Sequence, residues 1–288
     1  MDTQALELDL DRAALGSLVR DIGIPPRPSL LIDLQTELLK DDQDPRNLSR
    51  IASSDVAIAA ALLKTANSPV MGLSRRAETI DAAIQLLGLR QCECILTELV
   101  LRKVMPTDGP ILTRFWDVAC KRAHAMHWLA REEQLLSADL AYTFGLFADV
   151  GIPLLMCKFI LPSYLNTLSL ANESDQCFTE VEQERHHTDH TVVGALLARD
   201  WGVSQTVLLA VRLHHDYRAL DDNDVPEVVR RLVALGLVAE HVIQRYNGQN
   251  RHAEWTKGGE LAMKALAVNE GNLMDWCDEL HEQFDAGL

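Results

Sequence analysis

Apolar residues recur at helical spacing along almost the whole chain, and this periodicity limits the possible fold more than any other feature. One such stripe is formed by Ile58, Leu62, Leu63 and Ala66. Val, Ile and Thr nowhere alternate with polar residues over the length of a strand. The sequence therefore predicts an all-α fold.

Proline and glycine residues divide this helical pattern into segments. The linker 106–110 contains two prolines and a glycine, which makes it the best candidate boundary between two helical lobes. We expect an N-terminal extension or helix over 1–21, a first lobe over 22–105 and a second lobe over 111–288. The segments on either side of the linker share no repeat. The expected architecture is a two-lobed helical bundle.

Several helix ends can be identified from residues that cap a helix. Asp55, Thr79 and Ser204 each stand just before an apolar helical run, where their side chains can accept hydrogen bonds from free backbone N–H groups. Gly88 should end the helix that begins after Thr79. Asn67 precedes Ser-Pro and should stop another helix, because asparagine tolerates a left-handed cap.

The charge balance is strongly acidic, with 27 Lys and Arg against 42 Asp and Glu and a formal net charge of −15. A protein that binds nucleic acid needs basic side chains to displace counterions from phosphates, so we expect no nucleic-acid partner. The acidic amino terminus is unlike a signal peptide, and no stretch approaches the ~18 uncharged apolar residues that span a bilayer. The six scattered cysteines fit reduced thiols better than disulfides. We therefore expect a cytoplasmic protein without a membrane partner.

An ordered set of motifs spans both lobes. The first lobe contains Ile-Pro-Pro-Arg-Pro at 24–28, a helix that begins at Asp55, Leu-Leu-Lys-Thr-Ala-Asn-Ser at 62–68, and Ala-Ala-Ile-Gln-Leu-Leu-Gly at 82–88. The second contains Leu-Phe-Ala-Asp-Val-Gly-Ile at 146–152, followed by His190, Trp201 and the pair His214-His215. In this order the motifs resemble the HDOD (HD-related output domain) family, a relative of the HD phosphohydrolases.

The resemblance implies where a metal site would lie. HD phosphohydrolases hold a metal with a His, a His-Asp pair and a later Asp, and the metal activates water. The resemblance places His124 at the first His, Ala148-Asp149 at the pair and Glu240 at the last Asp. Ala148 carries only a methyl group, and the helper Lys that follows the pair is replaced at 152 or 153. The resemblance therefore implies a broken metal site, with no metal and no cofactor expected.

The remaining polar residues of the site are His190, His214 and His215, which are candidates for a vestigial site. Each also has a structural interpretation. Asp149 can cap a helix that starts near 152, and the histidine pair can bond free carbonyls at a helix end. His190 follows two other histidines at helical spacing, which favours adventitious metal binding. The charged and polar residues 182–185 just before them indicate a solvated helix face.

The resemblance implies an output module of bacterial signal transduction that acts through a protein partner and has no hydrolase activity. The alternative is a degenerate HD phosphohydrolase that still binds a metal or nucleotide weakly near His124, Asp149 and His214. No P-loop, dinucleotide-binding or nucleophile-elbow motif is present. The candidate partner surface is an exposed apolar groove rimmed by the loop residues Val70, Met71 and Leu73, for which ordinary loop packing is the other interpretation.

Overall fold

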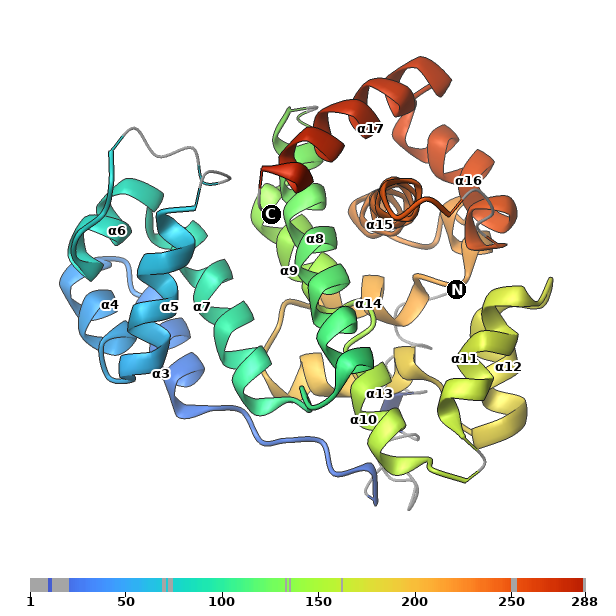
Figure 1. The fold of residues 1–288 in the computed structure, drawn as a ribbon, viewed down its shortest axis with the longest axis horizontal. Coiled ribbons are helices and arrows are strands. Elements are labelled where there is room, and N and C mark those ends of the chain that lie inside the picture. Colours follow the sequence, from blue (N-terminus) through green and yellow to red (C-terminus); the bar gives the residue numbers. More distant parts are fainter. Residues whose placement is uncertain are drawn as a thin grey trace. The chain divides into compact units, whose positions relative to one another are not determined.

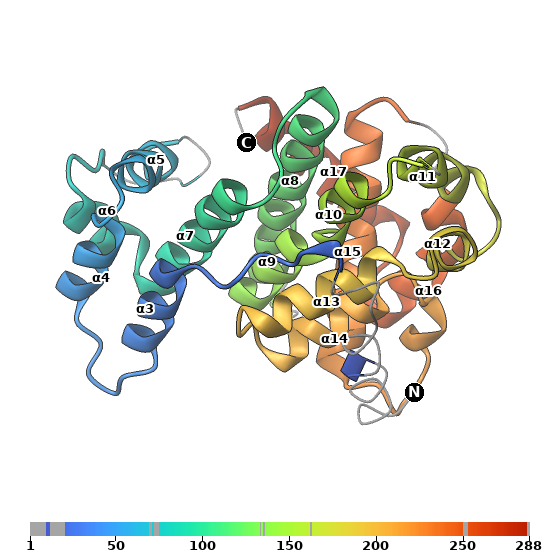
Figure 2. The same cartoon turned by 90° about the horizontal axis from the view of Figure 1, so that it is seen from below.

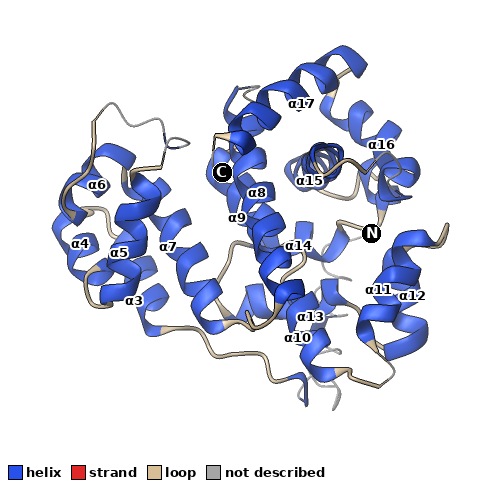
Figure 3. Ribbon diagram, in the orientation of Figure 1, coloured by secondary structure: helices blue, strands red, loops and turns tan. Residues whose placement is uncertain are grey.

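The computed structural model describes residues 10–11, 21–68, 71, 75–132, 134, 136–161, 163–249 and 253–286. Every regular element within these ranges is a helix, as Figure 3 shows. The predicted all-α fold is confirmed. Val70 and Leu73 of the candidate partner surface lie outside the described residues, and Met71 is partly buried.

The chain divides into two compact units, each of which is described by itself. The larger unit contains the described residues up to Pro25 together with 108–281, and the smaller contains 26–107 with the last described residues from Glu282. Residues 22–25 thus group with the larger unit, although the sequence assigned them to the first lobe. One reason is that the indole Nε1 of Trp201 donates to the carbonyl of Pro25 at 3.0 Å.

The described residues 26–107 of the smaller unit form the following helices (Figure 1): α3 (Ser29–Leu38), α4 (Pro45–Ala52), α5 (Val56–Ala66), α6 (Ile80–Leu87) and α7 (Leu89–Val104). Their apolar stripes meet in a core in which Leu34, Leu48, Leu62 and Ile95 are fully buried. Burial of these stripes provides the main drive for folding, since apolar side chains leave water.

The predicted caps are present. Asp55 accepts hydrogen bonds from the backbone N of Ala57 at 3.0 Å and starts α5, and Thr79 starts α6 in the same way. Gly88 ends α6 with a φ of 81°, a conformation that favours glycine. Asn67 ends α5, but its φ of −87° is not left-handed, so that detail of the prediction was wrong. Its side chain instead bonds both the N and the O of Ala77 at 2.8 Å, and this tie fixes the chain beyond the helix.

The larger unit contains α8 (Pro110–Glu132), α9 (Ala138–Phe147), α10 (Gly151–Lys158), α11 (Tyr164–Glu173), α12 (Phe178–His186), α13 (His190–Asp200), α14 (Gln205–Leu213), the 3-10 turn η2 (Tyr217–Leu220), α15 (Glu227–Tyr246) and α16 (Ala253–Leu266). It also contains α17 (Glu270–Asp285) as far as His281. Helices α8 and α9 pack along each other, and α13 lies beside α14 (Figure 2). Ser204 caps α14 by accepting from the N of Val207 at 3.4 Å, as predicted. These helices surround the residues of the candidate site.

Two glycines let helices approach closely around this site. A Cβ on Gly145 of α9 would lie 2.8 Å from the Cα of Ala123 in α8. A Cβ on Gly151 at the start of α10 would lie 2.2 Å from the carbonyl O of His190 in α13. Real Cβ atoms essentially never come this close to backbone, so a side chain at either position would force the helices apart.

The stretch 138–158 is long and apolar enough, by length and composition, to cross a membrane. Within the structure 67% of its 18-residue window is buried in the larger unit. The stretch is also broken into α9 and α10 by a turn at 148–150. These features are those of a core segment that packs against neighbouring helices.

Candidate functional site

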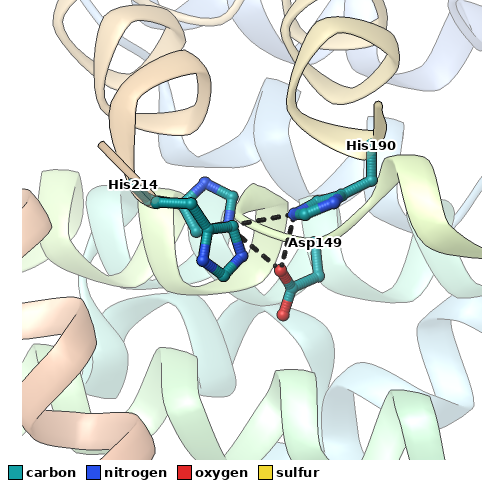
Figure 4. Close-up of side chains that lie close together, drawn as sticks. Asp149, His190 and His214 are labelled. Atoms are coloured by element: carbon teal, nitrogen blue, oxygen red, sulfur yellow. Dashed lines mark hydrogen bonds and ion pairs between the residues drawn. The ribbon is translucent and has the colours of Figure 1, made fainter. Parts of the chain in front are cut away.

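Four polar side chains from separate parts of the larger unit converge at one point. Asp149 lies in the turn between α9 and α10, His190 is the first residue of α13, and His214 and His215 follow the end of α14. Each offers one nitrogen or oxygen, and these four atoms lie within 4.8 Å of one another. Figure 4 shows His190 and His214 directed at the carboxylate of Asp149. We call these four residues the His-Asp cluster.

The two carboxylate oxygens of Asp149 have different partners. Oδ1 faces the imidazoles, at 3.1 Å from Nε2 of His214 and 3.4 Å from Nε2 of His190. Oδ2 accepts a hydrogen bond from Nη1 of Arg122 at 2.5 Å. The carboxylate therefore bridges a fixed positive charge on one side and the histidines on the other.

Arg122 reaches this position from α8 and is almost fully buried, with 6% of its side chain exposed. Its Nη1 also lies 3.4 Å from Oε2 of Glu240 on α15, and its Nε donates to the carbonyl of Gly145 at 2.9 Å. The close approach of α9 at Gly145 brings that carbonyl within reach. Because guanidinium stays protonated in proteins, Arg122 is a permanent cation between two carboxylates.

Each histidine of the cluster is oriented by an acceptor at its other ring nitrogen. Nδ1 of His190 lies 2.7 Å from Oε2 of Glu182, and Nδ1 of His215 lies 2.8 Å from Oε2 of Glu254. Nδ1 of His214 lies 2.8 Å from the carbonyl of Val211 one turn earlier. Partners of this kind fix the ring tautomer and turn Nε2 toward the centre of a site.

Burial acts to raise the pKa of Asp149, but the Arg122 charge and the hydrogen bond from His190 outweigh it and hold the pKa well below its usual range. Asp149 is therefore ionised at neutral pH. A buried charge of this kind is costly unless it is paired, and removing one partner of such a pair is strongly destabilising. Arg122 is the partner that makes the charge tolerable.

The neighbouring histidines titrate in opposite directions. Burial acts to lower the pKa of His190, but Glu182 and Asp149 raise it to about 10. Burial, together with the charge of His215, lowers the pKa of His214 to about 4. At neutral pH His190 is thus a cation and His214 is neutral. The Nε2–H of His190 can bond Nε2 of His214, which lies 3.2 Å away.

Glu182 was missed by the sequence interpretation, which placed 182–185 on a solvated helix face. Its side chain is fully buried and accepts from the hydroxyl of Tyr164 and from the backbone N of His190 as well as from the His190 ring. The three histidines expected on one helix face are also separated, because α12 ends at His186 and His187 adopts a φ of 56°. The turn between α12 and α13 is what brings Glu182 under His190.

The vestigial-site candidates divide into two groups. Asp149, His190, His214 and His215 form the cluster, and Glu240 joins it through Arg122. His124 does not join, because its ring packs edge-on against Tyr142 with centroids 5.2 Å apart. Ala148 is buried beside Asp149 and brings only its methyl group.

The structural interpretations of these residues are partly correct. Asp149 does not cap α10, whose N-cap Val150 has no side-chain hydrogen bond. His214 does bond a carbonyl at the end of α14, as predicted. His215 instead turns its ring to Glu254, which also accepts from Tyr217 at 2.6 Å.

A cavity of about 230 Å³ opens beside the cluster within the larger unit. Its polar lining includes Arg122, Asp149, His214, Glu240 and Glu254, and its apolar lining includes Phe144, Ile152, Phe178 and Leu237. A pocket that joins apolar walls to a few convergent polar groups is the usual form of a small-molecule site.

The described residues of the larger unit form an all-helical fold in which the cluster lies where the α9–α10 turn, the start of α13 and the end of α14 meet. The chain belongs to the HDOD domain family, whose model matches residues 24–217. A protein of Treponema pallidum (strain Nichols), described as uncharacterized, is 25% identical over 264 residues, which cover 86% of this chain and 48% of that protein. The chain thus spans about half the length of this relative.

Solved structures share the fold. A candidate signal transduction protein from Marinobacter aquaeolei VT8 superposes with a TM-score of 0.71 at 20% identity, covering 99% of this chain and 65% of that one. An HDOD domain protein of unknown function from Geobacter sulfurreducens superposes with a TM-score of 0.67 at 18% identity, covering 93% of this chain and 96% of that one. A candidate metal-dependent phosphohydrolase from Shewanella amazonensis SB2B superposes with a TM-score of 0.60 at 16% identity, covering 97% of this chain and 96% of that one.

The residues present do not fit the metal that the HD resemblance implies. Ala148 has no donor atom, and His124 points to Tyr142. Asp149 has one oxygen engaged by Arg122, so it cannot offer both to a metal. What remains is one carboxylate oxygen and three imidazoles beside a fixed positive charge.

Proposed function

We propose that this chain is a regulatory module of bacterial signal transduction that acts by binding a protein partner and does not hydrolyse phosphate esters. The observation that carries the second half of the proposal is the Arg122–Asp149 ion pair. A phosphohydrolase of the HD type needs that carboxylate for a metal that activates water. Here the carboxylate is committed to a guanidinium, and the adjacent ligand position is Ala148.

Membership of the HDOD family supports the regulatory half of the proposal. The Marinobacter structure is of a candidate signal transduction protein, which agrees with this class. The strongly acidic chain, with a formal charge of −15, favours a partner other than nucleic acid. We further propose that the chain works in the cytoplasm and without a cofactor.

Protein purified without a histidine tag tests the catalytic half. We expect less than one equivalent of bound metal and no phosphodiester hydrolysis above buffer when manganese is added. Asp149→Ala is the matched control, because it removes the carboxylate on which any metal-dependent activity would depend. Turnover by the wild type that Asp149→Ala abolishes would disprove the proposal.

Affinity purification from native cells tests the partner-binding half. The candidate surface contains Met71, and Met71→Glu would place a charge there. We expect the wild type to retain a stoichiometric partner that the variant binds more weakly. The exposed Ile160, 75% accessible and in the other unit, provides a control in Ile160→Glu. If neither substitution alters partner binding, Met71 is not part of the surface.

A second candidate function is weak binding of a metal by the His-Asp cluster. The observation that favours it is the convergence of four donor atoms within 4.8 Å, with each imidazole oriented by an acceptor at Nδ1. Groups in this outer position typically change metal affinity about 10- to 100-fold. The same metal analysis decides between the candidates, since one bound equivalent of metal that is lost in His214→Ala would favour the second.

A further inference from the structure

We infer that the guanidinium of Arg122 takes the place of a divalent cation beside Asp149, and that this side chain is what keeps the His-Asp cluster from binding a transition-metal ion such as zinc. The inference rests on the proposed function, in which the ancestral type of metal site is broken. It adds a second cause of the break, which lies on α8 and is separate from Ala148.

The first argument is the position of the guanidinium. Its Nη1 lies between Oδ2 of Asp149 at 2.5 Å and Oε2 of Glu240 at 3.4 Å. A third bond, from Nε to the carbonyl of Gly145 at 2.9 Å, fixes the plane of the group. Arg122 therefore bridges one carboxylate from the α9–α10 turn and one from α15, as a metal ion does in a carboxylate site.

The second argument is electrostatic. Arg122 is 6% exposed, so water screens its charge only weakly. A divalent ion bound at Oδ1 of Asp149 would share one carboxylate with this guanidinium and would be repelled by it. Because an arginine in a protein does not lose its proton, the repulsion cannot be relieved by a change of pH.

The third argument is that the rest of the cluster is already arranged as a ligand set, which becomes complete when His190 releases its Nε2 proton, as any imidazole must to ligate a metal. The Nε2 atoms of His190 and His214 lie 3.2 Å apart and within 3.4 Å of Oδ1 of Asp149. Glu182, the carbonyl of Val211 and Glu254 hold the opposite ring nitrogens. Three imidazoles with one carboxylate suit zinc and similar ions better than magnesium or calcium.

Arg122→Gln tests the inference, because glutamine keeps a polar group near Gly145 and removes the charge. Arg122→Lys is the matched control that keeps the charge. Zinc affinity is measured on tag-free protein by competition with a chromogenic chelator, and the cobalt complex is examined by visible absorption, which reports nitrogen ligands directly. We expect Arg122→Gln to bind one zinc about 10- to 100-fold more tightly than wild type and Arg122→Lys.

A further variant assigns the bound zinc to the cluster. The double variant Arg122→Gln, His214→Ala should lose the increase in zinc affinity that Arg122→Gln alone produces. Zinc held by surface histidines would still bind to the double variant. Equal zinc affinity of wild type, Arg122→Gln and Arg122→Lys would overturn the inference. An increase in zinc affinity that persists when His214 is replaced would also overturn the inference.

Loss of Arg122 removes the guanidinium that two carboxylates share, so Arg122→Gln is expected to be less stable than wild type. Arg122→Gln combined with Glu240→Gln removes one positive and one negative charge and keeps the net charge unchanged. If either variant folds only with zinc, as judged by recovery of helical circular dichroism, the cation has replaced the guanidinium as inferred. If both variants fail to fold, in the presence of zinc and in its absence, the inference is overturned.

The test separates this inference from the proposed function on which it rests. One equivalent of zinc bound by the wild-type cluster would contradict both the broken site and the role of Arg122. Absence of zinc in the wild type and in a folded Arg122→Gln would leave the broken site standing and would refute the role of Arg122 alone.

Discussion

Substitution of Gly151 by alanine should destabilise the larger unit by an amount that the structure allows to be estimated. Gly151 begins α10, and its Cα faces the backbone of α13 at His190. An added Cβ would lie 2.2 Å from the His190 carbonyl O and 3.0 Å from the N of Gly194. The nearest ordinary contact is 3.4 Å, so one helix must move by roughly 1.2 Å. Both obstacles are backbone atoms, which cannot turn aside as a side chain can.

An extra methyl group in a well-packed core typically costs about 1–3 kcal/mol, and a backbone obstacle places this change at the upper end. Alanine recovers up to about 1 kcal/mol of helix propensity in a helix interior, and less at the first residue of α10. The expected net loss is about 2–3 kcal/mol of unfolding free energy. For a unit of this size that corresponds to a decrease in Tm on the order of 5–10 °C.

Thermal and urea unfolding followed by far-ultraviolet circular dichroism measure this loss. Gly194→Ala on the facing helix is the matched control, because the atoms nearest its Cβ would be the side-chain Val211 Cγ1 at 3.2 Å and Val150 Cγ1 at 3.4 Å, with the backbone N of Gly151 at an ordinary 3.5 Å. Those side chains can adjust, so we expect Gly194→Ala within about 1 kcal/mol of wild type. If Gly151→Ala is as stable as Gly194→Ala, the close approach of α10 and α13 does not hold the cluster together.

Three further predictions concern single side chains. Asp189 caps α13 by accepting hydrogen bonds from Thr191 N at 2.9 Å and Val192 N at 3.0 Å. Asp189→Ala should therefore lower the unfolding free energy by about 2 kcal/mol and Asp189→Asn by less. Equal unfolding free energies of the two variants in urea would contradict this. Burial acts to raise the pKa of Glu254, but hydrogen bonds and charge from His215 and a hydrogen bond from Lys257 lower it. The contribution of Glu254 to the unfolding free energy is therefore present above the unfolded pKa of about 4.3 and is lost as the pH falls through the lower folded value. Between pH 6 and pH about 3 the urea midpoint should therefore decrease more in wild type than in Glu254→Gln, and parallel decreases would disprove the assignment. Burial raises the pKa of Cys92 to about 12 while Cys157 is exposed, so a thiol reagent should label Cys157 first and Cys92 only after unfolding; a fast phase that survives in Cys157→Ser would contradict this.

Local features of the fold could be predicted because they depend on neighbours in the sequence. The caps at Asp55, Thr79 and Ser204 bond backbone groups two or three residues away, so the residue type and the following apolar run are sufficient. Gly88 needs a positive φ that other residues rarely adopt. The motif order at 146–152 likewise located Asp149, which the structure places in the His-Asp cluster.

The partners of Asp149 could not be predicted, because they depend on which face of each helix turns inward. Residues 122 and 124 project roughly 200° apart around α8, and the sequence assigned the site to His124. The structure turns Arg122 inward and places His124 against Tyr142. Arg122 directly follows Lys121 in the sequence, and such a basic pair is typical of a solvated helix face, so the sequence carried no signal for a buried ion pair.

The sequence by itself determined the helical fold and the HDOD family, since periodicity, caps and motif order are properties of the chain. Only the tertiary structure decided that Arg122, Asp149 and Glu240 form a closed ion-pair network and that Glu182 lies buried under His190. These contacts join residues from 8 to 118 positions apart. Their existence depends on helix packing, in which Gly145 and Gly151 allow a separation that no local pattern encodes.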